Sequence, residues 1–130
     1  YTWINHSFRV ISHLTYTYGQ NKTANEPLRR IPPVFGRLTG EYHRNGFFAA
    51  LDWTGAGEQN RLSSGDKSDH RINPKGTPGF GIISARLGYT YKFLSLEAGI
   101  ENILDQAYRM HGSGIDGYGR CVWLRTSFRF

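Results

Sequence analysis

Apolar and polar side chains alternate in two parts of the stretch from Leu94 to Phe130. The apolar positions are Leu94, Leu96, Ala98 and Ile100 in the first part, and Val122, Leu124, Phe128 and Phe130 in the second. A period of two is that of a β-strand with one apolar face and one polar face. The segment between them is polar and contains four glycines, which indicates a loop. The stretch therefore predicts two strands joined by a loop, with the last strand running to Phe130.

The same alternation predicts four earlier strands, at about residues 7–18, 34–43, 47–57 and 80–93. Asn45-Gly46 is typical of a two-residue hairpin turn, since both residues tolerate a positive φ. The connections alternate in length: 19–33, 58–79 and 110–119 are long, whereas 44–46 and the turn near 93 are short. No segment has a convincing helical pattern. The predicted fold class is all-β, with six antiparallel strands.

Alternating loop lengths are typical of a transmembrane β-barrel, which has short periplasmic turns and longer external loops. Each predicted strand is long enough to cross a membrane, which takes about 9–11 tilted residues. Six strands cannot close around a lumen lined by bulky charged side chains, so further strands are expected upstream. No signal peptide opens the chain, which is expected to be a fragment. A soluble β-sandwich is the alternative, and it would bury the apolar faces against a second sheet.

Composition narrows the alternatives. Hydrophobic residues make up 38% of the 130 positions, and no run approaches the roughly 18 apolar residues of a membrane helix. The net charge of +6 permits nucleic-acid binding, but the arginines are scattered singly along strands, which favours a charged barrel interior. One cysteine excludes an intramolecular disulfide framework. No metal or cofactor motif is recognised, and none is expected.

The alternation also predicts which side chains face lipid and which face the lumen. Leu87, Leu96, Leu124 and Phe128 are predicted to face lipid. The residues predicted to face the lumen are charged: Arg37, Glu41, Arg86, Glu97, Glu101, Arg125 and Arg129. Their signs are mixed, so they can pair across neighbouring strands.

Four motifs resemble one known family. The segment from Glu101 to Arg109, ENILDQAYR, is similar to the motif near the end of TonB-dependent outer-membrane receptors. HGSG at 111–114, Gly119-Arg120 and the aromatic strand ending at Phe130 resemble that family's last loop and last strand. EPLRRIPP at 26–33 resembles the proline-rich loop of this family. GTPGF at 76–80 resembles the turn that leads into the third-last strand of its barrel.

This resemblance implies a barrel of twenty-two strands with an N-terminal plug, of which residues 1–130 are the C-terminal segment without the plug. It implies transport, not enzymatic chemistry, with no catalytic residue, in the bacterial outer membrane. The ligand would be an iron chelate or a similar scarce compound such as haem or cobalamin. The implied partners are outer-membrane lipid and lipopolysaccharide, the TonB complex through the missing plug, and the barrel assembly machinery, which would read the terminal strand with Phe128 and Phe130. A porin-like barrel is the nearest alternative.

Candidate ligand contacts border the last loop: Tyr108, Arg109, His111 and Arg120. Aromatic rings stack on chelates and arginines pair with catecholates or carboxylates, while a histidine is also a possible haem ligand. The alternative is that glycines shape the loop and local pairs anchor the arginines.

Two further groups lie in the other long loops. Asp66, Asp69 and His70 are residue types that bind metals, or with Ser68 form a hydrolytic site, but no supporting motif frames them. A solvated loop is favoured there. Arg29-Arg30 suits either anionic ligands, including lipopolysaccharide phosphates, or ordinary solvation.

Overall fold

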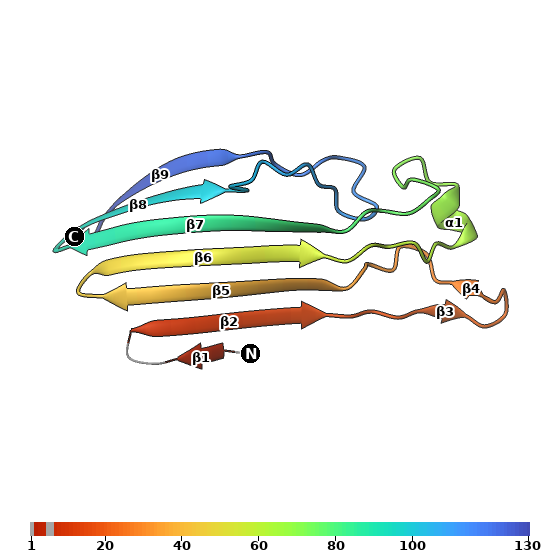
Figure 1. The fold of residues 1–130 in the computed structure, drawn as a ribbon, viewed down its shortest axis with the longest axis horizontal. Coiled ribbons are helices and arrows are strands. Elements are labelled where there is room, and N and C mark those ends of the chain that lie inside the picture. Colours follow the sequence, from red (N-terminus) through yellow and green to blue (C-terminus); the bar gives the residue numbers. More distant parts are fainter. Residues whose placement is uncertain (1, 5–6) are drawn as a thin grey trace.

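The computed structural model describes residues 2–4 and 7–130, which form one antiparallel sheet in chain order (Figure 1). Its strands are β1 (Thr2–Ile4), β2 (Phe8–Thr15), β5 (Phe35–Arg44), β6 (Phe47–Ala56), β7 (Phe80–Tyr91), β8 (Leu94–Glu101) and β9 (Cys121–Phe128). A small hairpin, β3 (Gln20–Asn21) with β4 (Glu26–Pro27), lies in the first long loop. The second long loop contains α1 (Ser64–Lys67). Each strand of the large sheet pairs with the next one along the chain.

The six predicted strands and the all-β class are confirmed, with three corrections of detail. A seventh, short strand, β1, pairs with β2 at the edge of the sheet, Thr2 opposite Ile11. The first predicted strand ends its pairing at Thr15, not at residue 18. The four-residue α1 contradicts the expectation of no helix, because Ser63 and Asp66 form a capping box that satisfies its first N–H groups. Tyr1 lies outside the described residues.

The hairpin predicted at Asn45-Gly46 is confirmed, because both residues have positive φ, 50° and 80°. Gly46 also lies against the next hairpin: a Cβ atom there would come within 2.4 Å of the Thr90 carbonyl oxygen. The turn between β7 and β8 likewise uses a left-handed residue, Lys92. Glycine at position 46 therefore meets two requirements, the backbone conformation and the close approach of β7.

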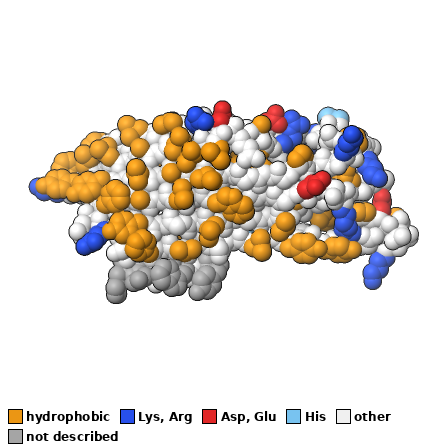
Figure 2. Space-filling model, viewed as in Figure 1, with side chains coloured by type: hydrophobic (Ala, Val, Ile, Leu, Met, Phe, Trp, Pro, Cys, Tyr) orange, Lys and Arg blue, Asp and Glu red, His pale blue; other side chains and the backbone are white. Residues whose placement is uncertain are grey.

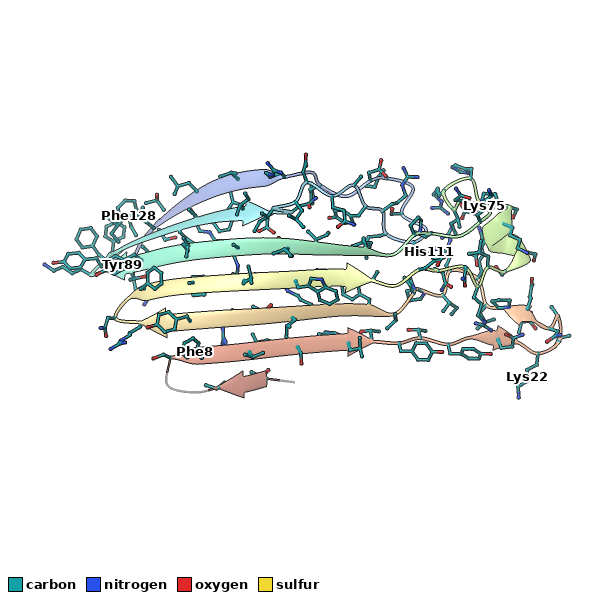
Figure 3. All side chains as sticks on the ribbon, viewed as in Figure 1. Phe8, Lys22, Lys75, Tyr89, His111 and Phe128 are labelled. Atoms are coloured by element: carbon teal, nitrogen blue, oxygen red, sulfur yellow. The ribbon has the colours of Figure 1, made fainter. Side chains whose placement is uncertain are left out.

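The two short turns lie at one end of the sheet and the three long loops at the other (Figure 1). Aromatic residues gather at the short-turn end, where Phe8 stacks on Tyr42 with ring centroids 4.9 Å apart, and Tyr42 lies near Phe47. Tyr89 and Phe128 lie at this end too, whereas His111 and Lys75 lie at the loop end (Figure 3). An aromatic band at one end of the strands is typical of the interface region of a membrane barrel.

One face of the sheet is an extensive exposed apolar surface. Leu87, Leu96 and Leu124 are 57%, 47% and 75% exposed. Figure 2 shows hydrophobic side chains spread over the strands, with charged side chains more frequent toward the loop end. Among the described residues the large sheet is a single layer with no second sheet packed on it, so the β-sandwich alternative lacks its partner layer. A face this apolar matches contact with lipid hydrocarbon.

Among the described residues, no helix is both long and apolar enough to cross a membrane.

Candidate functional site

The second long loop is organised around a buried aspartate. Asp66 is 1% exposed and accepts hydrogen bonds from the Ser63 backbone N–H and hydroxyl, at 3.1 and 2.9 Å. Its other oxygen accepts the backbone N–H of Arg30, in the first long loop, at 3.0 Å. Burial raises the pKa of Asp66, but these hydrogen bonds outweigh burial, and the pKa lies below its usual value. Asp66 therefore stays ionised and ties the first long loop to the second.

Asp69 makes the second tie between these loops. Its carboxylate accepts from Arg29 at 3.1 Å, from Arg30 at 2.9 Å and from Arg71 at 2.8 Å. Asp69 is 6% exposed. The expectation of a solvated loop is therefore wrong for Asp66 and Asp69, which are buried and paired, and it holds for the exposed His70. Within residues 2–4 and 7–130, no group of three or more acidic, histidine or cysteine residues could hold a metal ion.

The last long loop is fastened to the sheet by Asn102, which is 2% exposed and directly follows β8. Its side-chain amide donates to the carbonyls of Gln106 and Tyr118 at 2.9 and 2.8 Å, and its amide oxygen accepts the Gln106 N–H at 2.9 Å. Asp105 accepts the backbone N–H of Arg120 at 2.7 Å. These contacts join the two ends of the loop. Asn102 and Asp105 of the ENILDQAYR segment thus hold the two ends of the last long loop together.

The four candidate ligand contacts have different surroundings. Arg120 donates through Nε to the Ile103 carbonyl at 2.9 Å, which directs its guanidinium to the loop backbone. Tyr108 is half-buried and packs on Phe80, with ring centroids 4.8 Å apart. Arg109 pairs with Asp116 at 2.8 Å. The two arginines therefore have the local contacts that the alternative interpretation expected, whereas Tyr108 packs on a residue of β7.

His111 connects the last long loop to the second. Its Nδ1 lies 2.9 Å from the Thr77 hydroxyl, while Nε2 is buried with no hydrogen-bond partner among the described residues. Burial lowers the pKa of His111, and the nearby Asp66 carboxylate opposes this only in part. The ring is therefore neutral at pH 7. All three long loops are joined through Asp66, Asp69 and His111.

An apolar pocket of about 230 Å³ opens at the loop end of the sheet, and Arg109 and His111 both line it. The other lining residues come mainly from the strand ends and loop prolines: Thr15, Pro32, Pro33, Phe35, Ala56, Gly57, Thr77, Pro78, Phe80 and Met110. Tyr108 lines a neighbouring pocket with Asn102 and Tyr118. Arg120 lines neither of these two pockets. The structure thus brings two of the four candidates together. From the sequence alone, the prolines are recognised only as loop residues, and Phe80 only as the first residue of a strand.

The residues predicted to face the lumen lie on the polar face of the sheet, in two groups. Asp52 accepts from Arg37 at 2.7 Å, from Thr39 at 2.7 Å and from Arg86 at 3.1 Å. Glu41 accepts from Arg9 Nε at 2.7 Å and also lies near Arg86. These contacts link β2, β5, β6 and β7. Asp52 joins Arg37 to Arg86 and is central here. It was not among the predicted lumen-facing residues, although the alternation of its strand places it on the polar face.

The second group lies on β8 and β9. Glu97 is opposite Arg125, with a side-chain distance of 3.6 Å, and Glu101 accepts the Trp123 indole N–H at 3.3 Å. Arg129 follows β9, and its backbone N–H bonds to the Phe93 carbonyl at 2.9 Å. Phe128 pairs with Leu94, and Phe130 is fully exposed. The mixed charges pair across strands as the sequence predicts.

A meandering sheet with one apolar face, an aromatic band and loops gathered at one end defines the wall of a transmembrane β-barrel. Residues 1–103 match the family model described as "TonB dependent receptor-like, beta-barrel". The chain belongs to this family. Its members are transport receptors and not enzymes, and they reside in the bacterial outer membrane.

Two solved structures are similar along nearly the whole chain. The copper transporter OprC superposes with a TM-score of 0.80 at 22% identity, covering 98% of this chain and 22% of that one. The ferric-catecholate import receptor Fiu from E. coli K12, in its closed form, gives 0.72 at 20% identity, covering 98% and 19%. The chain therefore spans about a fifth of the length of these structures. The search of curated proteins found no match.

Proposed function

We propose that this chain is the C-terminal barrel segment of an outer-membrane receptor that takes up a scarce metal chelate with energy supplied through TonB. The observation that carries the proposal is the joined set of three long loops at one end of the sheet. They surround an apolar pocket lined by a neutral imidazole and a guanidinium. Such a pocket suits an organic chelate with apolar and anionic parts.

The complete receptor would comprise a twenty-two-strand barrel with an N-terminal plug that contacts the TonB complex. The polar face with Arg37, Glu41 and Arg86 would wall the passage, and the apolar face would contact lipid and lipopolysaccharide. The strand ending at Phe128 and Phe130 would be read by the barrel assembly machinery. The similarity of nearly the whole chain to about a fifth of two receptor structures supports this arrangement.

A ferric chelate such as a ferric siderophore is the first candidate ligand, because Arg109 at the pocket offers a partner for catecholate or carboxylate oxygens. Haem and cobalamin belong to the same class of ligand. A copper-bearing ligand is the second candidate, since Met110 and His111 line the same pocket and thioether and imidazole groups bind copper.

The test is uptake of radiolabelled ferric catecholate, haem, cobalamin and copper by cells that express the complete receptor. Matched cells that lack the receptor, and cells that lack TonB, are the controls. We expect one ligand to accumulate only when both receptor and TonB are present. Uptake that persists without TonB would favour a porin-like barrel and overturn the proposal.

A further inference from the structure

Three arginines from two loops converge on the single carboxylate of Asp69. Arg29 and Arg30 come from the first long loop, and Arg71 comes from the second. The Asp69 side chain is 3% exposed, whereas the arginine side chains are 54%, 47% and 36% exposed. The carboxylate thus forms the floor of the cluster, and the guanidinium groups reach solvent above it.

Most of the guanidinium donors remain available. Asp69 engages Nη2 of Arg29, Nη2 of Arg30, and Nε and Nη2 of Arg71. Within the described part of the chain, Nε and Nη1 of both Arg29 and Arg30 and Nη1 of Arg71 have no protein acceptor. Exposed donors of three arginines therefore lie around the Asp69 carboxylate.

The arginines are held in place by contacts along their stems and backbone. A Cβ atom on Gly65 would come within 3.0 Å of Arg29 Cδ, so the Arg29 stem packs directly on α1. A Cβ atom on Gly114, in the last loop, would come within 2.9 Å of Arg71 Cγ. The backbone of Arg30 is fixed by Asp66. The cluster is therefore built from all three long loops and is preorganised before any ligand arrives.

The charge balance of the cluster is incomplete. Three guanidinium groups share one carboxylate, so these four side chains together carry two more positive charges than negative ones. Asp66 lies nearby, but it is buried and accepts from N–H and hydroxyl groups, not from a guanidinium. Glu26, the neighbouring exposed acid, accepts from the backbone N–H and hydroxyl of Ser64. Like charges this close repel one another unless an anion joins them.

We propose that Arg29, Arg30 and Arg71 form an oxyanion-binding site for a phosphate group. A phosphate monoester carries nearly two negative charges and several strong acceptor oxygens, which match the charge excess and the divergent free donors. Arginine forks bind such oxygens in pairs. The phosphate belongs either to a phosphorylated glycolipid of the outer leaflet or to a soluble ligand. This inference does not depend on the proposed transport activity.

The test measures binding of radiolabelled inorganic phosphate and of bisphosphorylated lipid A to the complete receptor, purified in detergent at low ionic strength. The variants Arg30→Gln and Arg71→Gln remove one guanidinium each. Lys75→Gln removes an exposed cation of the same loop that has no part in the cluster. Resistance of the barrel to unfolding in sodium dodecyl sulfate at room temperature checks that each variant is folded.

We expect at least tenfold weaker phosphate or lipid A binding in both arginine variants, and unchanged binding in Lys75→Gln. Binding of lipid A that dephosphorylation abolishes, without binding of inorganic phosphate, assigns the site to the membrane surface. Binding of inorganic phosphate that lipid A does not displace assigns it to a soluble ligand. Absence of binding by the unaltered receptor, or equal losses in all three variants, would overturn the proposal.

Discussion

Asn102 illustrates how one side chain can hold a whole loop. It adopts a positive φ of 50°, which asparagine and aspartate tolerate better than other residues with a Cβ atom. Its amide donates to two part-buried carbonyl groups that lie at opposite ends of the last long loop, those of Gln106 and Tyr118. The residue therefore fixes both the backbone bend after β8 and the return of the chain toward β9.

Replacement of Asn102 by Asp separates these two roles, because aspartate keeps the backbone preference but lacks the amide donors. Two carbonyl groups would lose their partners, and each unsatisfied buried group costs about 1–3 kcal/mol. We expect a loss of about 2–6 kcal/mol in the unfolding free energy of the receptor, measured by urea titration in lipid vesicles. Asn60→Asp, at an exposed position, is the control. A loss no larger than that of the control would contradict the assigned hydrogen bonds.

His111 is predicted to make the loop assembly sensitive to mild acid. Because burial lowers its pKa below the usual 6.5, the folded loops bind this proton more weakly than the unfolded chain does. The stabilisation is complete above about pH 6.5 and is lost as the pH falls through the lowered pKa. The carboxyl groups of Glu26, Asp66 and Asp116 also have lowered pKa values, and their protonation affects stability only in a more acidic pH range.

Hydrogen exchange at 110–119, corrected for the intrinsic rate at each pH, measures this effect. We expect protection to fall between pH 7.5 and 5.0 in the unaltered receptor and to change much less in His111→Gln. The exposed His70 provides the control, and His70→Gln should retain the full pH dependence. An unchanged pH dependence in His111→Gln would assign the effect to another group.

At the scale of elements, the sequence predicted the strands much more accurately than the structure of the loops. Alternation is a strong signal because each strand has one apolar and one polar face, and it located all six long strands and both short turns. It could not locate α1, since four residues are too few for a helical period. Nor could it show that Asp66 and Asp69 are buried, because their partners Arg29 and Arg30 lie about 40 positions away along the chain.

The candidate site was predictable only in part, for the same reason. The residues Arg109 and His111 were found because they border a recognisable motif. The pocket they share also needs Pro32, Phe35 and Phe80, which come from other loops and strands. A contact between segments so far apart in sequence has no local pattern, so only the folded chain reveals it.

Each strand is predicted to present its apolar face to lipid, and Leu96 on β8 tests this. Leu96 is 47% exposed and lies opposite Thr126 on the apolar face. If it lies near the bilayer midplane, Leu96→Arg should cost roughly 2–4 kcal/mol of stability in lipid vesicles. Ser95→Arg, one residue earlier and on the polar face, should cost much less. Equal costs at the two positions would contradict the predicted orientation of the faces.

At the scale of the whole molecule, the short turns and long loops occupy opposite ends of the sheet (Figure 1). In a barrel with its C-terminus in the periplasm, the turns at 44–46 and near 93 are periplasmic. The loops at 19–33, 58–79 and 110–119 are then outside the cell. Strand parity and loop length lead independently to the same orientation.

Epitope tags in intact cells check this orientation. A tag inserted after Lys75, in the second long loop, should bind antibody, while one between Asn45 and Gly46 should bind only after the outer membrane is permeabilised. Lys75 is exposed and lies outside the capped helix, so the insertion spares the contacts of Asp66 and Asp69. Exposure of the Asn45 tag with concealment of the Lys75 tag would invert the topology.

The contacts of Asp66, Asp69 and His111 between the long loops also limit which loops can be exchanged between such a receptor and its relatives. A chimaera that exchanges 58–79 alone, for a segment without Asp69 and Thr77, would leave Arg29 and Arg30 without their carboxylate and His111 without its hydroxyl partner. The three long loops thus depend on one another for their structure, although each is a separate segment of the chain. Grafting a new specificity onto this barrel requires moving all three together.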